Sequence, residues 1–199
     1  MLIKNNFPII LASTSQVRNE ILKSCKLDYE VMKPLYDEDG EKQFLQKMSP
    51  KKLAIFLASK KALSISEIHP ESYVIGADQV CEFMRKDISK SQNINEAIKQ
   101  LTKFNGRNHY QNNGLVVAHK GKIIFTNFAR VRLKMRKLSS QQIIDYVNYD
   151  QSFGCAGSYK YEASGKHLFE RVEGDYYAIL GLSIQPLLNF LHSKKIINF

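Results

Sequence analysis

The sequence is poor in cysteine, contains no tryptophan and has no long run of apolar residues. Its three cysteines, Cys25, Cys81 and Cys155, are widely spaced and form no CxxC pair. This number and spacing support neither a disulfide framework nor a structural zinc site, because both need grouped cysteines. A membrane-spanning helix needs about 20 mostly apolar residues, and no stretch approaches that length. We therefore expect a cytoplasmic protein with buried thiols and no membrane partner.

Acidic residues are absent from one long segment, residues 97–144, although the chain contains 19 of them. Ten of the 29 lysines and arginines lie in this segment, so it carries the whole net charge of +10. These ten are Lys99, Lys103, Arg107, Lys120, Lys122, Arg130, Arg132, Lys134, Arg136 and Lys137. An excess of positive charge indicates an anionic partner, such as nucleic acid or a small polyphosphate.

Residues 130–136 alternate strictly between basic and apolar side chains. A period of two predicts a strand with one buried face and one solvated face. A basic stripe can bind phosphates, but sites for single-stranded nucleic acid also present stacking aromatic residues, and none interleave here. We therefore favour a solvated sheet face and expect no nucleic acid partner.

The chain does contain enough apolar residues for a folded core. It has 199 residues, of which 44% are hydrophobic and 24% are charged, and this composition excludes a disordered or low-complexity protein. The length fits one domain over residues 1–199 better than two. Strand and helix patterns alternate from the first residues, so the expected fold class is α/β, with a mixed sheet and flanking helices.

The expected elements place several polar residues at strand ends. Apolar stretches predict strands over residues 7–12, 27–32 and 73–77, and a hairpin over 110–119 and 122–136. Helices are expected over 50–68, 93–104, 184–194, from a cap at Ser139 or Ser140 through 147, and from the hydroxyl caps at 13–15 to about 26. The strand over 73–77 is expected to end at Asp78 and Gln79, and α/β sheets usually bind ligands at the carboxyl ends of strands.

The candidate site residues form two chemical sets. Hydroxyl and cationic groups that suit a triphosphate are Ser13, Ser15, Arg18, Lys61 and Lys90. Carboxylates are Glu38, Asp78 and Glu162. Carboxylates repel a polyphosphate unless a divalent metal lies between them, so the combination indicates metal-dependent phosphoanhydride hydrolysis. Taken singly, Lys61 also fits a solvated helix face, and Glu38 fits an exposed acidic loop.

A series of short motifs resembles the Maf proteins, which are nucleoside triphosphate pyrophosphatases. The motifs follow the family's order over nearly the whole chain, which makes the series far more specific than any single motif. They are LASTSQVR at 11–18, Asp37–Glu38, Lys61–Ala62, VIGADQVC at 74–81, Lys90, residues 105–109, CAGSYKYE at 155–162, FERVEG at 169–174 and Gly181–Leu182.

The resemblance implies hydrolysis between the α- and β-phosphates, which gives a nucleoside monophosphate and pyrophosphate with the help of Mg²⁺ or Mn²⁺. It implies that Asp78 accepts the proton of the attacking water, and that Glu38 and Asp78 serve the metal. The residues it assigns to the phosphates are Ser13, Ser15, Arg18, Lys61 and Lys90. The implied fold is an elongated mixed sheet with a central cleft, similar to inosine triphosphatase and commonly found as a homodimer.

Three positions, Val17, Gln79 and Glu162, bear on the choice of nucleotide. Gln79 follows the catalytic Asp78, and Glu162 stands in the late glycine-containing loop, a pair that resembles the 7-methyl-GTP pyrophosphatase branch of the family. A carboxylate at Glu162 can accept both N–H groups of the cationic 7-methylguanine edge, although it can equally serve the metal or a phosphate-bound water. Tyr159 and Tyr161 are candidates for stacking on that ring.

Several residues depart from the branch pattern and keep other substrates open. Val17 stands where tryptophan is usual, Asn19 replaces a second arginine, and Ser183 replaces a proline. The loss of the tryptophan removes a possible stacking surface for the base. A pyrophosphatase for dTTP and UTP, or one of broad range, is the first alternative. A nucleic-acid-binding or cell-division regulatory factor is an alternative from another class.

Overall fold

The computed structural model describes residues 3–36, 45 and 48–199. Within them the main feature is a mixed seven-stranded sheet. Its order is β3 (Glu30–Met32), β2 (Ile9–Ala12), β4 (Tyr73–Phe83), β6 (Asn108–His119), β7 (Lys122–Met135) and β8 (Phe169–Glu173), with β5 (Lys86–Ile88) paired to β4. β2 runs parallel to β3 and β4, and the other pairs are antiparallel. The expected α/β class with a mixed sheet is confirmed.

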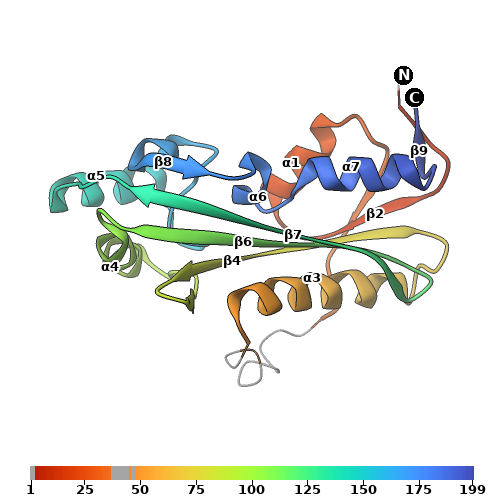
Figure 1. Cartoon of the computed structure of the whole chain (residues 1–199), viewed down its shortest axis with the longest axis horizontal. Coiled ribbons are helices and arrows are strands. Elements are labelled where there is room, and N and C mark those ends of the chain that lie inside the picture. The colour runs from red at the N-terminus through yellow and green to blue at the C-terminus, as the bar shows by residue number, and fades with distance from the viewer. Residues whose placement is uncertain (1–2, 37–44, 46–47) are drawn as a thin grey trace.

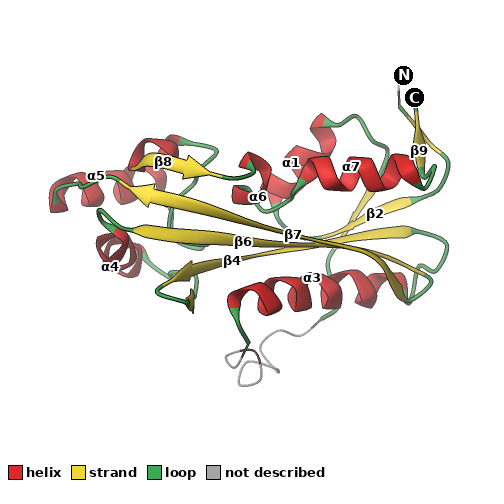
Figure 2. Cartoon of the chain, in the orientation of Figure 1, coloured by secondary structure: helices red, strands yellow, loops and turns green. Residues whose placement is uncertain are grey.

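Helices cover both faces of this sheet (Figures 1 and 2). α3 (Pro50–Ser66) lies on one face, while α1 (Gln16–Ser24), α6 (Tyr176–Ile179) and α7 (Ile184–Ser193) lie on the other. α4 (Ile94–Phe104), α5 (Ser140–Asp150) and the short 3₁₀ helix Ser164–Leu168 lie near the ends of β6 and β7 that are farthest from β2. The two ends of the chain meet, because β1 (Lys4–Asn5) pairs with β9 (Ile197–Asn198).

The helix starts follow the capping residues in the sequence. The side chains of Ser15, Ser49, Asn93 and Ser139 each accept a hydrogen bond from a backbone N–H in the first turn of α1, α3, α4 and α5, respectively. Such a side chain pairs one of the N–H groups that a helix start otherwise leaves without a partner. No helix in the described part of the chain is long and apolar enough to cross a membrane.

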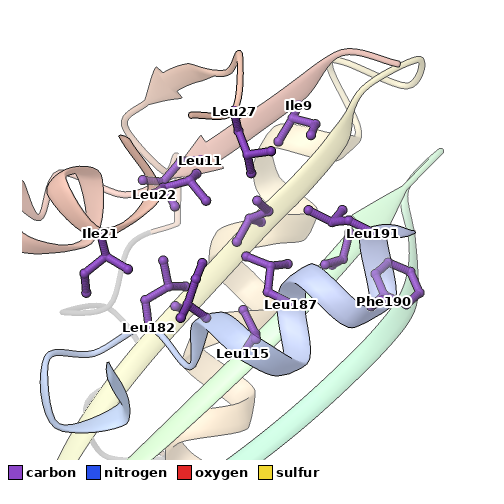
Figure 3. Close-up of a cluster of buried hydrophobic side chains, with 14 of the residues drawn as sticks. Ile9, Leu11, Ile21, Leu22, Leu27, Leu115, Leu182, Leu187, Phe190 and Leu191 are labelled. Atoms are coloured by element: carbon purple, nitrogen blue, oxygen red, sulfur yellow. The ribbon is translucent and has the colours of Figure 1, made fainter. Parts of the chain in front are cut away.

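Two apolar clusters lie on the same face of the sheet. Figure 3 shows the first, in which side chains of β2, α1 and α7 surround Leu115 of β6. The second gathers α4, α5 and the inward residues of β7 around Phe104 and Leu133. Odd-numbered residues of β4 reach these clusters, with Ile75 in the first and Cys81 in the second. Even-numbered residues of β4 such as Val74 and Val80 face α3 instead.

Helix α3 lies unusually close to the sheet because two glycines leave room for its backbone. A Cβ placed at Gly76 of β4 would lie 2.3 Å from the carbonyl oxygen of Ala58, and one at Gly114 of β6 would lie 2.4 Å from that of Ala54. Neither distance is possible for a real side chain. The helix backbone therefore rests directly on these strands.

The strand expected over residues 73–77 is longer than predicted. β4 continues through Asp78 and Gln79 to Phe83, so the prediction that Asp78 ends its own strand was wrong. The two polar residues that suggested an end have partners from distant segments, since Asp78 pairs with Lys61 and Gln79 donates to α6 carbonyls. It is the neighbouring strand that ends here. Leu11 of β2 pairs with Ile75, and β2 stops at Ala12.

The alternation over residues 130–136 is confirmed. Val131, Leu133 and Met135 are buried, while Arg130 and Arg132 are exposed. The cations on this face have partners within the chain: Arg130 pairs with Glu82, Arg132 with Glu173, and the Lys134 ammonium donates to the carbonyl of Gly106. These contacts support the interpretation of this stripe as a solvated sheet face.

Candidate functional site

The segment that follows β2 presents hydroxyl groups and backbone N–H groups at one point. Ser13 is 3% exposed, and its Oγ accepts a hydrogen bond of 3.2 Å from the backbone N–H of Ser15. The Oγ of Ser15 in turn accepts from the backbone N–H of Arg18 at 3.4 Å, which caps helix α1. A helix N-terminus with hydroxyl groups beside it favours an anion, because its dipole and its N–H groups are directed there.

Arg18 reaches from α1 across the end of β2. Its Nε donates to the carbonyl of Gly181 at 2.8 Å, and its Nη1 donates to Ser13 Oγ at 3.4 Å. Burial lowers the pKa of the Arg18 guanidinium, and the negative charge of Asp78 acts in the opposite direction. The group stays charged at neutral pH because an arginine pKa lies far above 7. A fixed, desolvated cation of this kind suits a phosphate oxygen.

Lys61 and Asp78 form an ion pair between α3 and β4. Their side chains are only 19% and 12% exposed. The alternative that Lys61 lies on a solvated helix face, which its position after Lys60 allowed, is therefore wrong. Asp78 faces α3, beyond the point where β2 ends. The structure therefore joins Ser13, Ser15 and Arg18 by hydrogen bonds and pairs Lys61 with Asp78, whose charge is near enough to act on the Arg18 guanidinium.

Lys90 and Glu162 lie in a second region, on irregular segments, and both are exposed. They share a neighbour in Cys155. Burial raises the pKa of that thiol, the charge of Glu162 raises it further, and the charges of Lys160 and Lys90 oppose this. Lys90 and Glu162 are thus both close enough to Cys155 for their charges to change the pKa of its thiol.

The remaining candidate residues are Val17, Gln79 and Glu38. Val17 is half-buried against the apolar cluster under α1 and α7. The amide nitrogen of Gln79 donates to the carbonyls of Ala178 and Ile179 at the end of α6. Glu38 lies outside the described residues.

One of the two tyrosines proposed to stack on a base is a core residue. Tyr159 is 4% exposed, its hydroxyl hydrogen-bonds to His109 Nε2 and Gln111 Nε2, and its ring packs edge-on against Phe169. The expectation that it stacks on a nucleotide was therefore wrong. Tyr161 is half-buried, with its ring 5.8 Å from that of Tyr176.

Two buried asparagines of β6 carry polar contacts that the sequence analysis missed. Asn112 donates to the Glu82 carboxylate at 3.0 Å, on the α3 side of the sheet. Asn113 donates to the backbone carbonyl of Asp78 at 3.1 Å. Asparagine is disfavoured in strands, so two consecutive asparagines inside an expected strand were the available signal.

Among the described residues, Asp78 is the carboxylate of this site that could bind a metal. No group of three or more His, Cys, Asp and Glu side chains that could hold a metal ion occurs among residues 3–36, 45 and 48–199. Magnesium is commonly bound by one or two carboxylates together with substrate phosphates. Asp78, beside the cationic and hydroxyl groups, fits a metal that is held partly by phosphate oxygens.

Known proteins match this sequence over nearly the whole chain. The family described as Maf-like protein matches residues 8–194. A "Nucleoside triphosphate pyrophosphatase" of Bradyrhizobium diazoefficiens is 37% identical over 96% of this chain and 95% of its own. Proteins of the same name from Rhodopseudomonas palustris and Legionella pneumophila are 33% and 34% identical over 96% of this chain and 96% and 95% of their own. The solved Staphylococcus aureus Ham1 protein overlaps 94% of this chain and 99% of its own, with 14% identity and a TM-score of 0.45, too low to support an argument.

Proposed function

The chain belongs to the Maf-like protein family, and we propose that it is a nucleoside triphosphate pyrophosphatase that cleaves between the α- and β-phosphates. The names of its relatives support this activity. The observation that carries the proposal is the meeting of Arg18, Lys61 and Asp78 from three separate segments beyond the end of β2. Two half-buried cations and one carboxylate can offset charge on the phosphates and accept a proton from water, and phosphoanhydride hydrolysis uses both functions.

The roles of the side chains follow from their chemistry. Asp78 accepts a proton from water as the water oxygen attacks the α-phosphorus. The bond from the α-phosphorus to the bridging oxygen breaks, and pyrophosphate leaves with the bonding electrons. Ser13, Ser15 and Arg18 bind phosphate oxygens, and Lys61 offsets the negative charge that builds up there. A phosphate group at this place competes with Asp78 for the Lys61 ammonium, which frees the carboxylate to act as the base.

Further residues complete the proposed site. Lys90 binds the outer phosphates, and Glu38 joins Asp78 in holding Mg²⁺ or Mn²⁺. When bound, the metal supplies charge compensation on the phosphates. The proposed assembly is a homodimer, an expectation carried by the family resemblance, and sedimentation analysis of the purified chain tests it.

The proposed substrate is 7-methyl-GTP, with dTTP, UTP or a broad range as the alternative. Glu162 supports it, because an exposed carboxylate can accept two charge-assisted hydrogen bonds from a cationic guanine. Val17 and Gln79 complete the set of proposed specificity residues. Tyr161 is the remaining candidate for stacking.

A panel of nucleotides tests the function and the substrate together. Purified protein is incubated with 7-methyl-GTP, GTP, dTTP and UTP in Mg²⁺ or Mn²⁺, and the products are separated. The proposal expects a monophosphate and pyrophosphate, with 7-methyl-GTP cleaved fastest. Release of orthophosphate and a diphosphate would contradict the cleavage position. Cleavage of dTTP as fast as 7-methyl-GTP would favour the alternative substrates.

A further inference from the structure

The loop between α6 and α7, Leu180–Ser183, contacts the candidate site at two points. Gly181 accepts the hydrogen bond from Arg18 Nε at 2.8 Å. Two residues later, Ser183 donates to Asn113 Oδ1 through its backbone N–H at 3.1 Å and through its hydroxyl at 2.9 Å. Between them, Leu182 is fully buried in the first apolar cluster (Figure 3).

The hydroxyl of Ser183 is used in an unusual way. Ser183 is the N-cap residue of α7, and an N-cap serine normally accepts a hydrogen bond from the first turn of its own helix. Here no such bond forms, and the hydroxyl instead donates across to β6. The helix gives up a stabilising cap, and the contact with Asn113 takes its place.

Asn113 joins this loop to the strand that carries Asp78. It is fully buried, and its amide nitrogen donates to the backbone carbonyl of Asp78. Both ends of the amide are therefore engaged, with two donors from Ser183 on the oxygen and Asp78 on the nitrogen. Such a network, inside a low-dielectric core, is rigid because each lost bond leaves a buried polar atom without a partner.

We propose that Asn113 is a positioning residue that fixes Asp78 relative to Arg18 through the loop Leu180–Ser183. The proposal rests on the proposed pyrophosphatase function. Arg18 and Asp78 come from α1 and β4, and this loop is bonded to the side chain of one and, through Asn113, to the backbone of the other. The loop therefore sets the distance between Arg18, which binds phosphate, and Asp78, which is the base. A change in that distance slows the chemical step more than it weakens substrate binding.

A double-mutant cycle separates positioning from general stability. Asn113→Ser should lower kcat about tenfold and change KM less than about twofold, because the base is misplaced while the phosphate groups remain. In the Asp78→Asn background the same substitution should lower kcat less than about twofold, since the group it positions no longer accepts a proton. Equal losses in the two backgrounds would overturn the proposal.

A milder variant guards against loss of folding. Ser183→Ala removes one of the two donors to Asn113, and we expect kcat to fall about threefold, with recovery in Ser183→Thr. Ser193→Ala is the matched control, because it removes a hydroxyl that donates to the carbonyl of Phe190 near the end of the same helix. Unchanged kcat in Ser183→Ala, or the same loss in Ser193→Ala, would overturn the proposal.

Hydrogen exchange gives a result that does not depend on activity. Asn113→Ser should increase amide exchange about tenfold or more both around residues 76–80 and around 180–184, because one side chain links the two segments. Faster exchange near residues 76–80 alone would overturn the link. Wild-type protein that releases no pyrophosphate from any nucleotide would contradict the proposed function, and the exchange result would still decide whether the link exists.

Discussion

The first region of the candidate site differs from the second in the elements that carry it. Arg18, Lys61 and Asp78 of the first region lie on α1, α3 and β4, near the point where β2 ends. Lys90 and Glu162 of the second region lie on irregular segments of the chain. The first group is largely buried and bonded to other parts of the protein, and the second is exposed. Rigid elements hold reacting groups accurately, while loops tolerate change and carry selectivity. The difference favours chemistry in the first region, while in the proposed site the second region contributes Lys90 to the outer phosphates and Glu162 to the base.

The sharpest test of the first region is Asp78→Asn. Removing the proposed base should lower kcat by about 10²- to 10⁴-fold while the protein stays folded. Initial rates of pyrophosphate release measure this effect. Asp145→Asn, the same chemical change at an exposed residue of α5, should leave the rate unchanged. Full activity in Asp78→Asn would remove this residue from the chemical step.

Lys61→Met should have the next largest effect. The substitution keeps the length of the side chain but removes the positive charge, and we expect kcat/KM to fall about 10²-fold because charge on the phosphates is no longer offset. The same change at the exposed Lys99 of α4 serves as the control. A loss below threefold would mean that the ion pair with Asp78 serves the fold and not the reaction.

Glu162→Gln tests the second region. It removes one negative charge, so the ratio of kcat/KM for 7-methyl-GTP to that for GTP should fall about tenfold, while activity on GTP changes little. Glu170→Gln, at an exposed position of β8, is the matched control. If the ratio is unchanged and both activities fall together, Glu162 serves the metal or the phosphates instead of the base.

Mild acid should loosen the second region through His109. Burial lowers the pKa of this histidine to about 3, so the unfolded chain binds a proton from about pH 6.5 downward while the folded chain does not. Stability from this group is therefore complete above about pH 6.5 and declines as pH falls, by about 1 kcal/mol between pH 7 and 5.5. Urea unfolding of wild type and His109→Phe measures the difference.

The same experiment connects acid to the loop that carries Glu162. His109 stacks on Phe104 and hydrogen-bonds to Tyr159, three residues before that carboxylate. Loss of amide protection at pH 5.5, relative to the slower intrinsic exchange at that pH, should appear first around residues 155–162, and not around Lys61. An equal response in both regions would contradict the contrast drawn between them.

Local signals in the sequence predicted much of the framework. The caps at Ser15, Asn93 and Ser139 and the start of α3 at Pro50 depend on neighbouring residues, and all were confirmed. Long-range partners were not visible. The polar residues Asp78 and Gln79 suggested that β4 was short, because nothing nearby in the sequence indicated their partners, Lys61 and the α6 carbonyls.

The candidate site shows the same division. Arg18, Lys61 and Asp78 were expected from motifs, but the ion pair between the last two depends on how α3 lies on the sheet. Asn113 escaped notice because its partners, Ser183 and Asp78, are distant in sequence. Tyr159 looked available as part of a glycine-containing loop, yet its hydroxyl is held by the core.

The close approach of α3 at Gly76 and Gly114 has a consequence for how this protein can change over time. The separation between helix and sheet is set by backbone atoms in contact, and not by the volumes of side chains that mutation can enlarge or shrink. Lys61 lies on α3 and Asp78 lies on β4. Substitutions that change side-chain volumes in the surrounding core should therefore change the distance between these two residues little. Substitution of either glycine would push α3 away from the sheet and lift Lys61 away from Asp78, so we expect neither position to accept another amino acid.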